Sequence, residues 1–178
     1  INYYSPNRVL LISFLGAMAA VTADTWATEI GSLSTKNPVL ITDWKNKVLP
    51  GTSGGITLIG TIGGLVGSFF IGLIGVGIFN YVQPLSSSST DSYLLIFIIT
   101  ISGGMGLFID SLIGATIQVM YRCDICEVNT EKRVDINGHK THYLKGIIWL
   151  GNDWVNFFAS AIGGIAALLM VLNTNFTK

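Results

Sequence analysis

The sequence has few charged residues. Only 11% of its 178 residues are Asp, Glu, Lys or Arg and 50% are hydrophobic, whereas an ordinary soluble domain carries about 25% charged residues. Its ten basic and ten acidic residues balance, so it lacks the basic field of a nucleic-acid-binding protein. It also lacks the alternating strands that a membrane β-barrel needs. These absences leave an integral membrane protein built from helices.

Four apolar stretches are long enough to cross a bilayer, which takes about 20 residues. They cover approximately residues 9–30, 54–82, 93–120 and 147–172. The third contains Gly103, Gly104 and Gly106, which predicts that this span is tilted or broken. We therefore predict an all-α bundle of about four transmembrane helices, a single domain over residues 1–178. Because the sequence begins at Ile1 rather than Met, we expect it to lack an N-terminal part.

Basic residues concentrate in two connections between these stretches. Residues 31–53 contain three lysines, residues 121–146 contain five Lys or Arg residues, and the remaining two are Arg8 and Lys178. With four spans, the two basic connections lie on the same side of the membrane. The positive-inside rule places them in the cytoplasm, although it does not say which membrane is spanned.

Three carboxylates lie within or at the ends of the apolar stretches: Asp24, Asp110 and Asp153. A charge in the hydrocarbon costs about 2.5–3.5 kcal/mol on insertion scales, so these residues indicate a function. All three lie toward the cytoplasmic ends of their spans, which predicts one cavity facing the cytoplasm. Carboxylate oxygens suit Mg²⁺, a hard cation, and we predict that these three residues are catalytic metal ligands.

Further polar residues accompany each carboxylate. Thr28 shares a helix face with Asp24, whereas Glu29 points about 140° away, so one straight helix cannot aim both acids at one point. Glu29 could instead cap the interface and pair with a loop lysine. Two clusters each cover about 100° of a helix face: Asp110, Ser111, Gly114 and Gln118, and Asn152, Asp153 and Asn156. Their alternatives to metal or phosphate binding are a buried hydrogen-bonded network and a polar helix entry.

A glycine-rich segment comes directly before the second span. It consists of Gly51, Thr52, Ser53, Gly54 and Gly55. Glycines let backbone amides turn toward a ligand, and a helix N-terminus attracts anions, so we predict a phosphate-binding turn. The alternative is a surface turn with a Ser or Thr N-cap. Within this span, Gly60-xxx-Gly64 and Gly63-xxx-Gly67 predict close helix packing.

The loop at residues 121–146 carries Cys123 and Cys126, followed by His139 and His142. This spacing is close to that of a structural zinc site. The alternative is a thiol pair without metal in a reducing compartment.

Four of these motifs, in this order, resemble the transmembrane protein 19 family over nearly the whole chain. They are TADTWATEIG (22–31), PGTSGG (50–55) with Gly60-Thr61, IDSLIGATIQ (109–118) and NDWVN (152–156). The plant plastid branch of this family is the phytyl-phosphate kinase of tocopherol synthesis, which phosphorylates a prenyl monophosphate with a nucleoside triphosphate. The resemblance carries over six residues: Asp24, Glu29, Asp110, Asn152, Asp153 and Asn156.

We therefore predict a membrane phosphotransferase that moves phosphate from CTP or ATP to a lipid or prenyl monophosphate at the cytoplasmic face. Its partners would be the bilayer and this substrate, with no nucleic acid. One alternative is a transporter or lipid-handling protein whose carboxylates couple to cation or proton movement. Another is a different polar-group transferase acting on a lipid phosphate. A transporter predicts polar residues at depths that reach both faces, and an enzyme predicts them at one.

Overall fold

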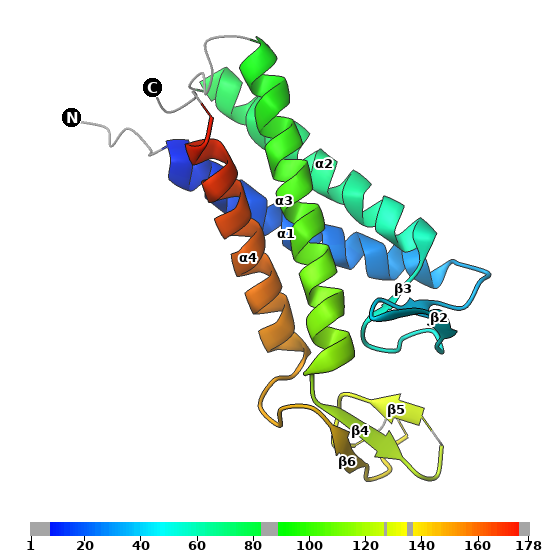
Figure 1. The fold of residues 1–178 in the computed structure, drawn as a ribbon. Coiled ribbons are helices and arrows are strands. Elements are labelled where there is room, and N and C mark those ends of the chain that lie inside the picture. Colours follow the sequence, from blue (N-terminus) through cyan, green and yellow to red (C-terminus); the bar gives the residue numbers. More distant parts are fainter. Residues whose placement is uncertain (1–7, 83–88, 127, 135–136, 175–178) are drawn as a thin grey trace.

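The structure, a computed structural model, describes residues 8–82, 89–126, 128–134 and 137–174 (Figure 1). Within these ranges, four helices are long and apolar enough to cross a membrane. They are α1 (Arg8–Ser32), α2 (Leu58–Val82), α3 (Ser89–Thr116) and α4 (Asn152–Leu172). The helix α1 packs against all three others. This confirms the predicted all-α membrane bundle.

Two helices begin later than hydropathy predicts. The helix α2 begins at Leu58 because Thr57 caps it, with its Oγ1 accepting the Gly60 N–H at 3.1 Å. The helix α4 begins at Asn152 because the apolar residues before it form a turn, in which the Leu150 N–H donates to the Ile147 carbonyl at 2.8 Å. Hydropathy marks what is apolar, whereas the cap and the turn decide where the helix starts.

The predicted break in the third span is wrong, because α3 is continuous across its three glycines. A Cβ on Gly103 would collide with Ser68 of α2 and Ala19 of α1, and a Cβ on Gly106 would collide with Ala20 of α1. These glycines therefore allow neighbouring helices to approach α3 closely.

Small residues fill the contacts between helices, while large apolar side chains face outward. Buried positions of α1 include Ala19 and Ala23, whereas Phe14 on the same helix is 59% exposed. A Cβ on Gly60 or Gly64 would approach the carbonyl oxygen of Ala27 or Ala23 to 2.6 and 2.7 Å. This confirms the close packing predicted from the glycine spacing and is the pattern expected in lipid.

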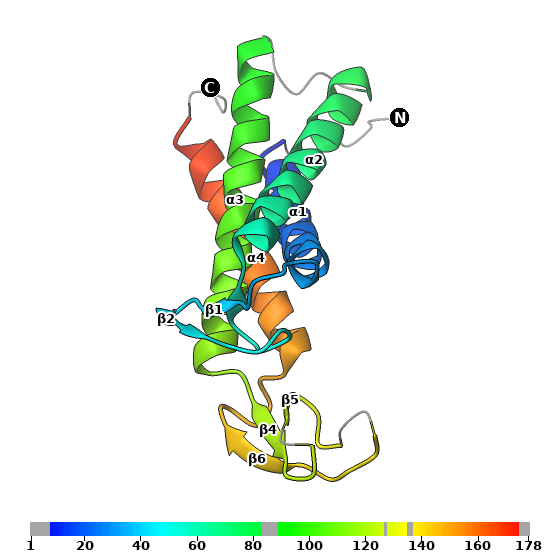
Figure 2. The same ribbon diagram turned by 90° about the vertical axis from the view of Figure 1, so that its right-hand side faces the viewer.

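Each of the two basic connections forms a small antiparallel sheet. The first sheet has the order β2-β1-β3 and the second β5-β4-β6. Their strands are β1 (Val39–Leu40), β2 (Asp43–Lys47), β3 (Gly55–Ile56), β4 (Met120–Cys123), β5 (Val128–Thr130) and β6 (His142–Lys145). Both sheets lie at the same end of the bundle (Figures 1 and 2), called the sheet end below. The two connections therefore share one side, as the span count predicts.

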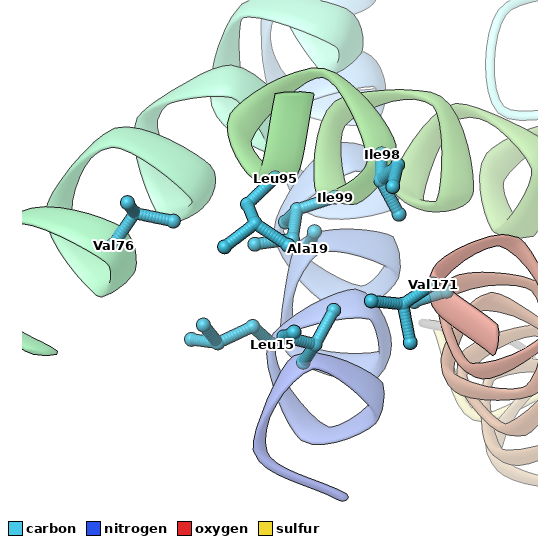
Figure 3. Close-up of a cluster of buried hydrophobic side chains, with 9 residues drawn as sticks. Leu15, Ala19, Val76, Leu95, Ile98, Ile99 and Val171 are labelled. Atoms are coloured by element: carbon cyan, nitrogen blue, oxygen red, sulfur yellow. The ribbon is translucent and has the colours of Figure 1, made fainter. Parts of the chain in front are cut away.

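The half of the bundle away from the sheet end has an apolar core (Figure 3). Ile12, Leu15, Leu95, Ile99 and Val171 are at most 7% exposed and pack together there. Two buried serines complete the packing, because each hydroxyl donates to a backbone carbonyl of α3. The Ser68 Oγ lies 3.0 Å from the Thr100 oxygen and the Ser102 Oγ lies 2.7 Å from the Ile98 oxygen. Apolar side chains therefore fill this half of the bundle, and the hydroxyls of the two buried serines have hydrogen-bond partners.

Candidate active site

A cavity of about 520 Å³ lies at the sheet end of the bundle. Its wall is formed by α1, α2, α3, the connection between α1 and α2, and single residues of the second basic connection and of α4. The polar side chains in this wall are Asp24, Thr25, Thr28, Glu29, Ser32, Thr52, Ser53, Thr57, Thr61, Asp110, Ser111, Glu131 and Asn152. Among these described lining residues there are four acids and no Lys, Arg or His. The cavity is thus strongly acidic.

Asp24 of α1 and Asp110 of α3 meet in this cavity. Both also line a smaller cavity of about 30 Å³ between α1, α3 and α4, so the two carboxylates border the same space from two helices. Gly106 lies one turn before Asp110 and packs against Ala20, one turn before Asp24. This small-residue contact brings the two carboxylates together. The Oδ2 atom of Asp110 is buried without a hydrogen-bond partner in the described part of the chain.

Thr28 and Glu29 also line the cavity, although both are exposed. Asp24 and Glu29 thus border one cavity without pointing at a single place, as their separation of about 140° on a straight helix predicts. The helix α1 is continuous through both residues, and the cavity is wide enough to border more than one of its faces. No salt bridge joins Glu29 to a described lysine, so the alternative of a lysine-paired Glu29 finds no support there.

The glycine-rich segment lines the cavity, but it is not the N-terminus of α2. Thr52 lies in a turn after β2, in which the Gly55 N–H donates to its carbonyl at 2.9 Å, and Gly55 begins β3. Gly51 and Gly54 have positive φ angles of 82° and 78°, which glycine adopts without strain. The turn itself therefore lacks the helix-dipole contribution predicted for it, although Thr57, Gly60 and Thr61 at the start of α2 line the same cavity.

The turn is held against the end of α3. The Ser53 hydroxyl donates to Oε1 of Gln118 at 2.6 Å. Gly114 leaves the room for this contact, since its Cβ would lie 2.5 Å from the Ser53 Oγ. Gln118 itself is 1% exposed and does not line the cavity, whereas Ser111 does. Gln118, predicted to support the site, thus positions the turn.

The three polar residues that open α4 occupy different places. Asn152 lines the large cavity and Asn156 lines the small one, where its Oδ1 is buried without a partner among the described residues. Asp153 is exposed and lines neither. The expectation that Asp153 lines the common cavity is therefore wrong, because at the exposed start of α4 its side chain faces solvent. Its charge nevertheless lies close enough to Glu131 to raise the pKa of that carboxyl.

Glu131 lines the cavity and was not found from the sequence. It follows β5 in the second basic connection. Burial raises the pKa of Glu131 above its ordinary value and the Asp153 charge raises it further, while the nearby Gln118 amide and Lys132 lower it. Its polar neighbours in sequence resemble any solvated loop, so no local pattern marks it. Only the pairing of β5 with β4 brings it to the cavity.

The second basic connection also gathers Cys123, Cys126 and His139. Their ligand atoms all lie within 4.8 Å of one another, and the Cys126 Sγ is 3.5 Å from the His139 Nδ1. His142, predicted to be a fourth member, is not in this cluster. Its Nδ1 lies 3.1 Å from Oδ2 of Asp124 at the surface, because β6 directs it to the partner strand instead.

Comparison with known proteins agrees with this architecture. A family model described as integral membrane protein DUF92 matches residues 2–164. An uncharacterized membrane protein of Methanocaldococcus jannaschii is 32% identical over 160 residues, which are 90% of this chain and 51% of that protein. No solved structure matches the chain.

Two similar proteins come from Arabidopsis thaliana. Protein PGR is 33% identical over 83% of this chain and 50% of its own length. Protein VTE6, chloroplastic, is 26% identical over 92% of this chain and 39% of its own length. The chain therefore spans about half the length, or less, of the curated relatives it matches.

Proposed function

The chain belongs to the integral membrane protein DUF92 family, and we propose that it is a membrane phosphotransferase of the prenyl-phosphate kinase type. It would transfer the terminal phosphate of a nucleoside triphosphate to a lipid monophosphate. One observation carries the proposal: carboxylates from two transmembrane helices and a glycine-rich turn line a single cavity. That cavity lies at the end of the bundle with the basic loops, which the positive-inside rule would place in the cytoplasm.

The charge of the cavity supports a requirement for Mg²⁺. Four acids line it without a basic residue among the described lining residues, so a phosphate group alone would be repelled. The Oδ2 of Asp110 and the Oδ1 of Asn156 are buried oxygens without described partners, and such oxygens suit a hard cation. Asp24 and Asp110 would hold the ion, which neutralises charge on the phosphates. Exposed Asp153 would act at most from the rim.

The other groups would position the substrates. The Ser53 backbone amide and the Thr52 hydroxyl would donate to phosphate oxygens, and the buried Gln118 would hold Ser53 in place by accepting its hydroxyl. An oxygen of the lipid phosphate would attack the terminal phosphorus of the nucleotide. The bond from that phosphorus to the bridging oxygen would break, the nucleoside diphosphate would leave, and the lipid diphosphate would be formed. Such a transfer depends on positioning and charge neutralisation rather than on a covalent intermediate with the protein.

Asp24 and Asp110 lie close to the outer surface of α1. They share the small cavity with Val21, which is 47% exposed. At about 30 Å³ this cavity holds little more than one water molecule, so the substrate phosphate would have to enter by the large cavity. A prenyl chain would then lie among the lipids beside α1.

A transporter would instead need polar groups that continue across the membrane. The far half of the bundle holds the apolar core. Four hydroxyls lie in the helices from the middle of the bundle toward that end, and each already donates to a backbone carbonyl: those of Ser13, Ser68, Thr100 and Ser102. The described helices carry their other charged residues, Arg8 and Asp91, only in the first turns at that far end. This distribution favours a transferase that works from one face.

Purified protein in lipid nanodiscs should convert a prenyl monophosphate to the diphosphate with Mg²⁺ and either CTP or ATP. Asp110→Asn should reduce the rate by at least 10²-fold, an order of magnitude typical of losing a group that stabilises the transition state. Asp43→Asn, an exposed residue of β2, is the matched control and should keep full activity. Turnover unaffected by Asp110→Asn, or no turnover with any lipid monophosphate, would contradict the proposal.

A further inference from the structure

The second basic connection has almost no core of its own. Among the residues between 121 and 146 whose side chains the structure describes, Tyr121 and Cys123 alone are buried, and all four residues of β6 are exposed. Units of fewer than about 40 residues usually need a metal, a disulfide or a partner to fold. The connection nevertheless folds into a three-stranded sheet, so its residues must be held together by something other than apolar burial.

The cluster of Cys123, Cys126 and His139 lies where such a link would act. Cys123 ends β4, Cys126 follows in the turn, and His139 follows the next turn, at Gly138 with φ of 84°. Two sulfur atoms and one imidazole nitrogen within 4.8 Å of one another are the soft and borderline ligands that Zn²⁺ prefers.

The surroundings of the cluster favour a metal over a hydrogen-bonded thiol pair. The Nδ2 of Asn137 donates to the Cys126 Sγ at 3.6 Å, and such donors to ligand atoms typically accompany metal–thiolate bonds. The Cys126 Sγ and the His139 Nδ1 lie 3.5 Å apart although 13 residues separate them in the sequence. The loop thus brings an imidazole as well as a second sulfur to one point, which is the ligand set of a zinc site.

We propose that Cys123, Cys126 and His139 bind one Zn²⁺ ion, whose fourth ligand comes from outside these three residues. The ion would tie the end of β4 to the two turns of this connection. Glu131 is part of the same connection, between Cys126 and His139 in sequence, and it lines the large cavity. The ion would therefore hold Glu131 at the cavity. A role in catalysis rests on the proposed function, whereas the metal site itself does not.

Metal analysis of the purified protein tests the site. We expect about one zinc ion per chain, as in a single structural site. Cys126→Ser and His139→Ala should each lose at least nine-tenths of it, and His142→Ala, outside the cluster, should retain it. Protein loaded with Co²⁺ should show thiolate-to-cobalt charge-transfer absorption that Cys126→Ser removes. Metal-free protein, equal loss in His142→Ala, or a Cys123–Cys126 disulfide found by mass spectrometry would each overturn the proposal.

Limited trypsin digestion tests the structural role without any activity assay. A zinc chelator, or Cys126→Ser, should speed cleavage after Lys132 and Lys140 at least tenfold, while cleavage after Lys45 in the first sheet stays unchanged. Unchanged cleavage after Lys132 and Lys140 in protein shown to have lost its zinc would refute the claim that the ion holds Glu131. Neither outcome depends on whether the protein is a kinase.

Discussion

Gly54→Ala should loosen the glycine-rich turn from the end of α3. Gly54 has a φ angle of 78°, where a residue with a Cβ is disfavoured by about 1–2 kcal/mol. Its Cβ would also lie 2.5 Å from the backbone nitrogen of Ala115 and 2.6 Å from the Ala115 Cα. Backbone cannot rotate out of the way as a side chain can, and overpacking of this kind costs about 1–3 kcal/mol. Backbone strain and collision together should weaken the packing of this turn on α3 by about 2–5 kcal/mol.

Gly51→Ala is the matched control, because it separates backbone strain from collision. Gly51 has nearly the same φ angle, 82°, but a Cβ there would have no neighbour within 4 Å. It should therefore show only the strain of about 1–2 kcal/mol. The two variants should therefore differ by about 1–3 kcal/mol in the free energy that holds the turn on α3. This corresponds to roughly a 5- to 150-fold difference in the population of the open form, in which the turn has separated from α3.

Limited trypsin digestion in nanodiscs measures this population, since Lys45 and Lys47 are exposed on β2 just before the turn. Cleavage by dilute protease follows the equilibrium population of the open form. We expect Gly54→Ala to be cleaved there 5- to 150-fold faster than Gly51→Ala, by the same conversion. Equal cleavage rates would refute the conclusion that this turn is seated on α3. The Gly54 variant should also lose phosphotransfer, because its turn no longer lines the cavity.

Three further predictions concern charge and packing. Since the folded-state pKa of Glu131 is raised, the folded protein binds more protons than the unfolded chain. The stability of the wild type should therefore fall as pH rises from the unfolded pKa of about 4.3 through the raised value. Thermal melts of Glu131→Gln should lack this fall, and a pH dependence identical to that of the wild type would contradict the burial of Glu131. Gly64→Ala should lower the stability by about 1–3 kcal/mol, because the added Cβ meets the Ala23 carbonyl oxygen. Its control is Gly77→Ala on the same helix, where a Cβ has nothing within 4 Å, so this variant should be neutral or more stable by up to about 1 kcal/mol. Equal melting temperatures of the two variants would contradict the packing of α1 on α2. Because the cavity is acidic, binding of a fluorescent nucleotide analogue should require Mg²⁺, and equal affinity in a chelator would contradict the assignment of Asp110 as a metal ligand.

The membrane bundle could be predicted because hydropathy records it directly. The four spans follow from length and apolar composition, and their even number places both basic connections at one end. The spacing of Gly60 and Gly64 predicted close packing in the same way, since small residues four apart lie on one helix face. These features depend on residues close together in sequence, and so the sequence alone suffices for them.

The errors arise where the outcome depends on distant contacts. The glycines of the third span predict that it is tilted or broken, but the contacts of Gly103 and Gly106 with α1 and α2 explain these glycines instead. Asp153 is predicted to be a metal ligand because it is a carboxylate at the cytoplasmic end of a span, yet its side chain is exposed and lines neither cavity. Glu131 could not be found because the strand pairing of β5 with β4 positions it.

The division of the bundle into two halves connects these results. Close contacts between small residues bring α1, α3 and α4 together along their length, and in the far half large apolar side chains fill the remaining space. Toward the sheet end, Asp24 and Asp110 occupy corresponding positions one turn beyond the contact of Ala20 with Gly106. Filling that space with apolar residues would give a more stable protein, since buried like charges are costly. The acidic cavity is therefore a cost in stability, which the bound cation proposed above would offset.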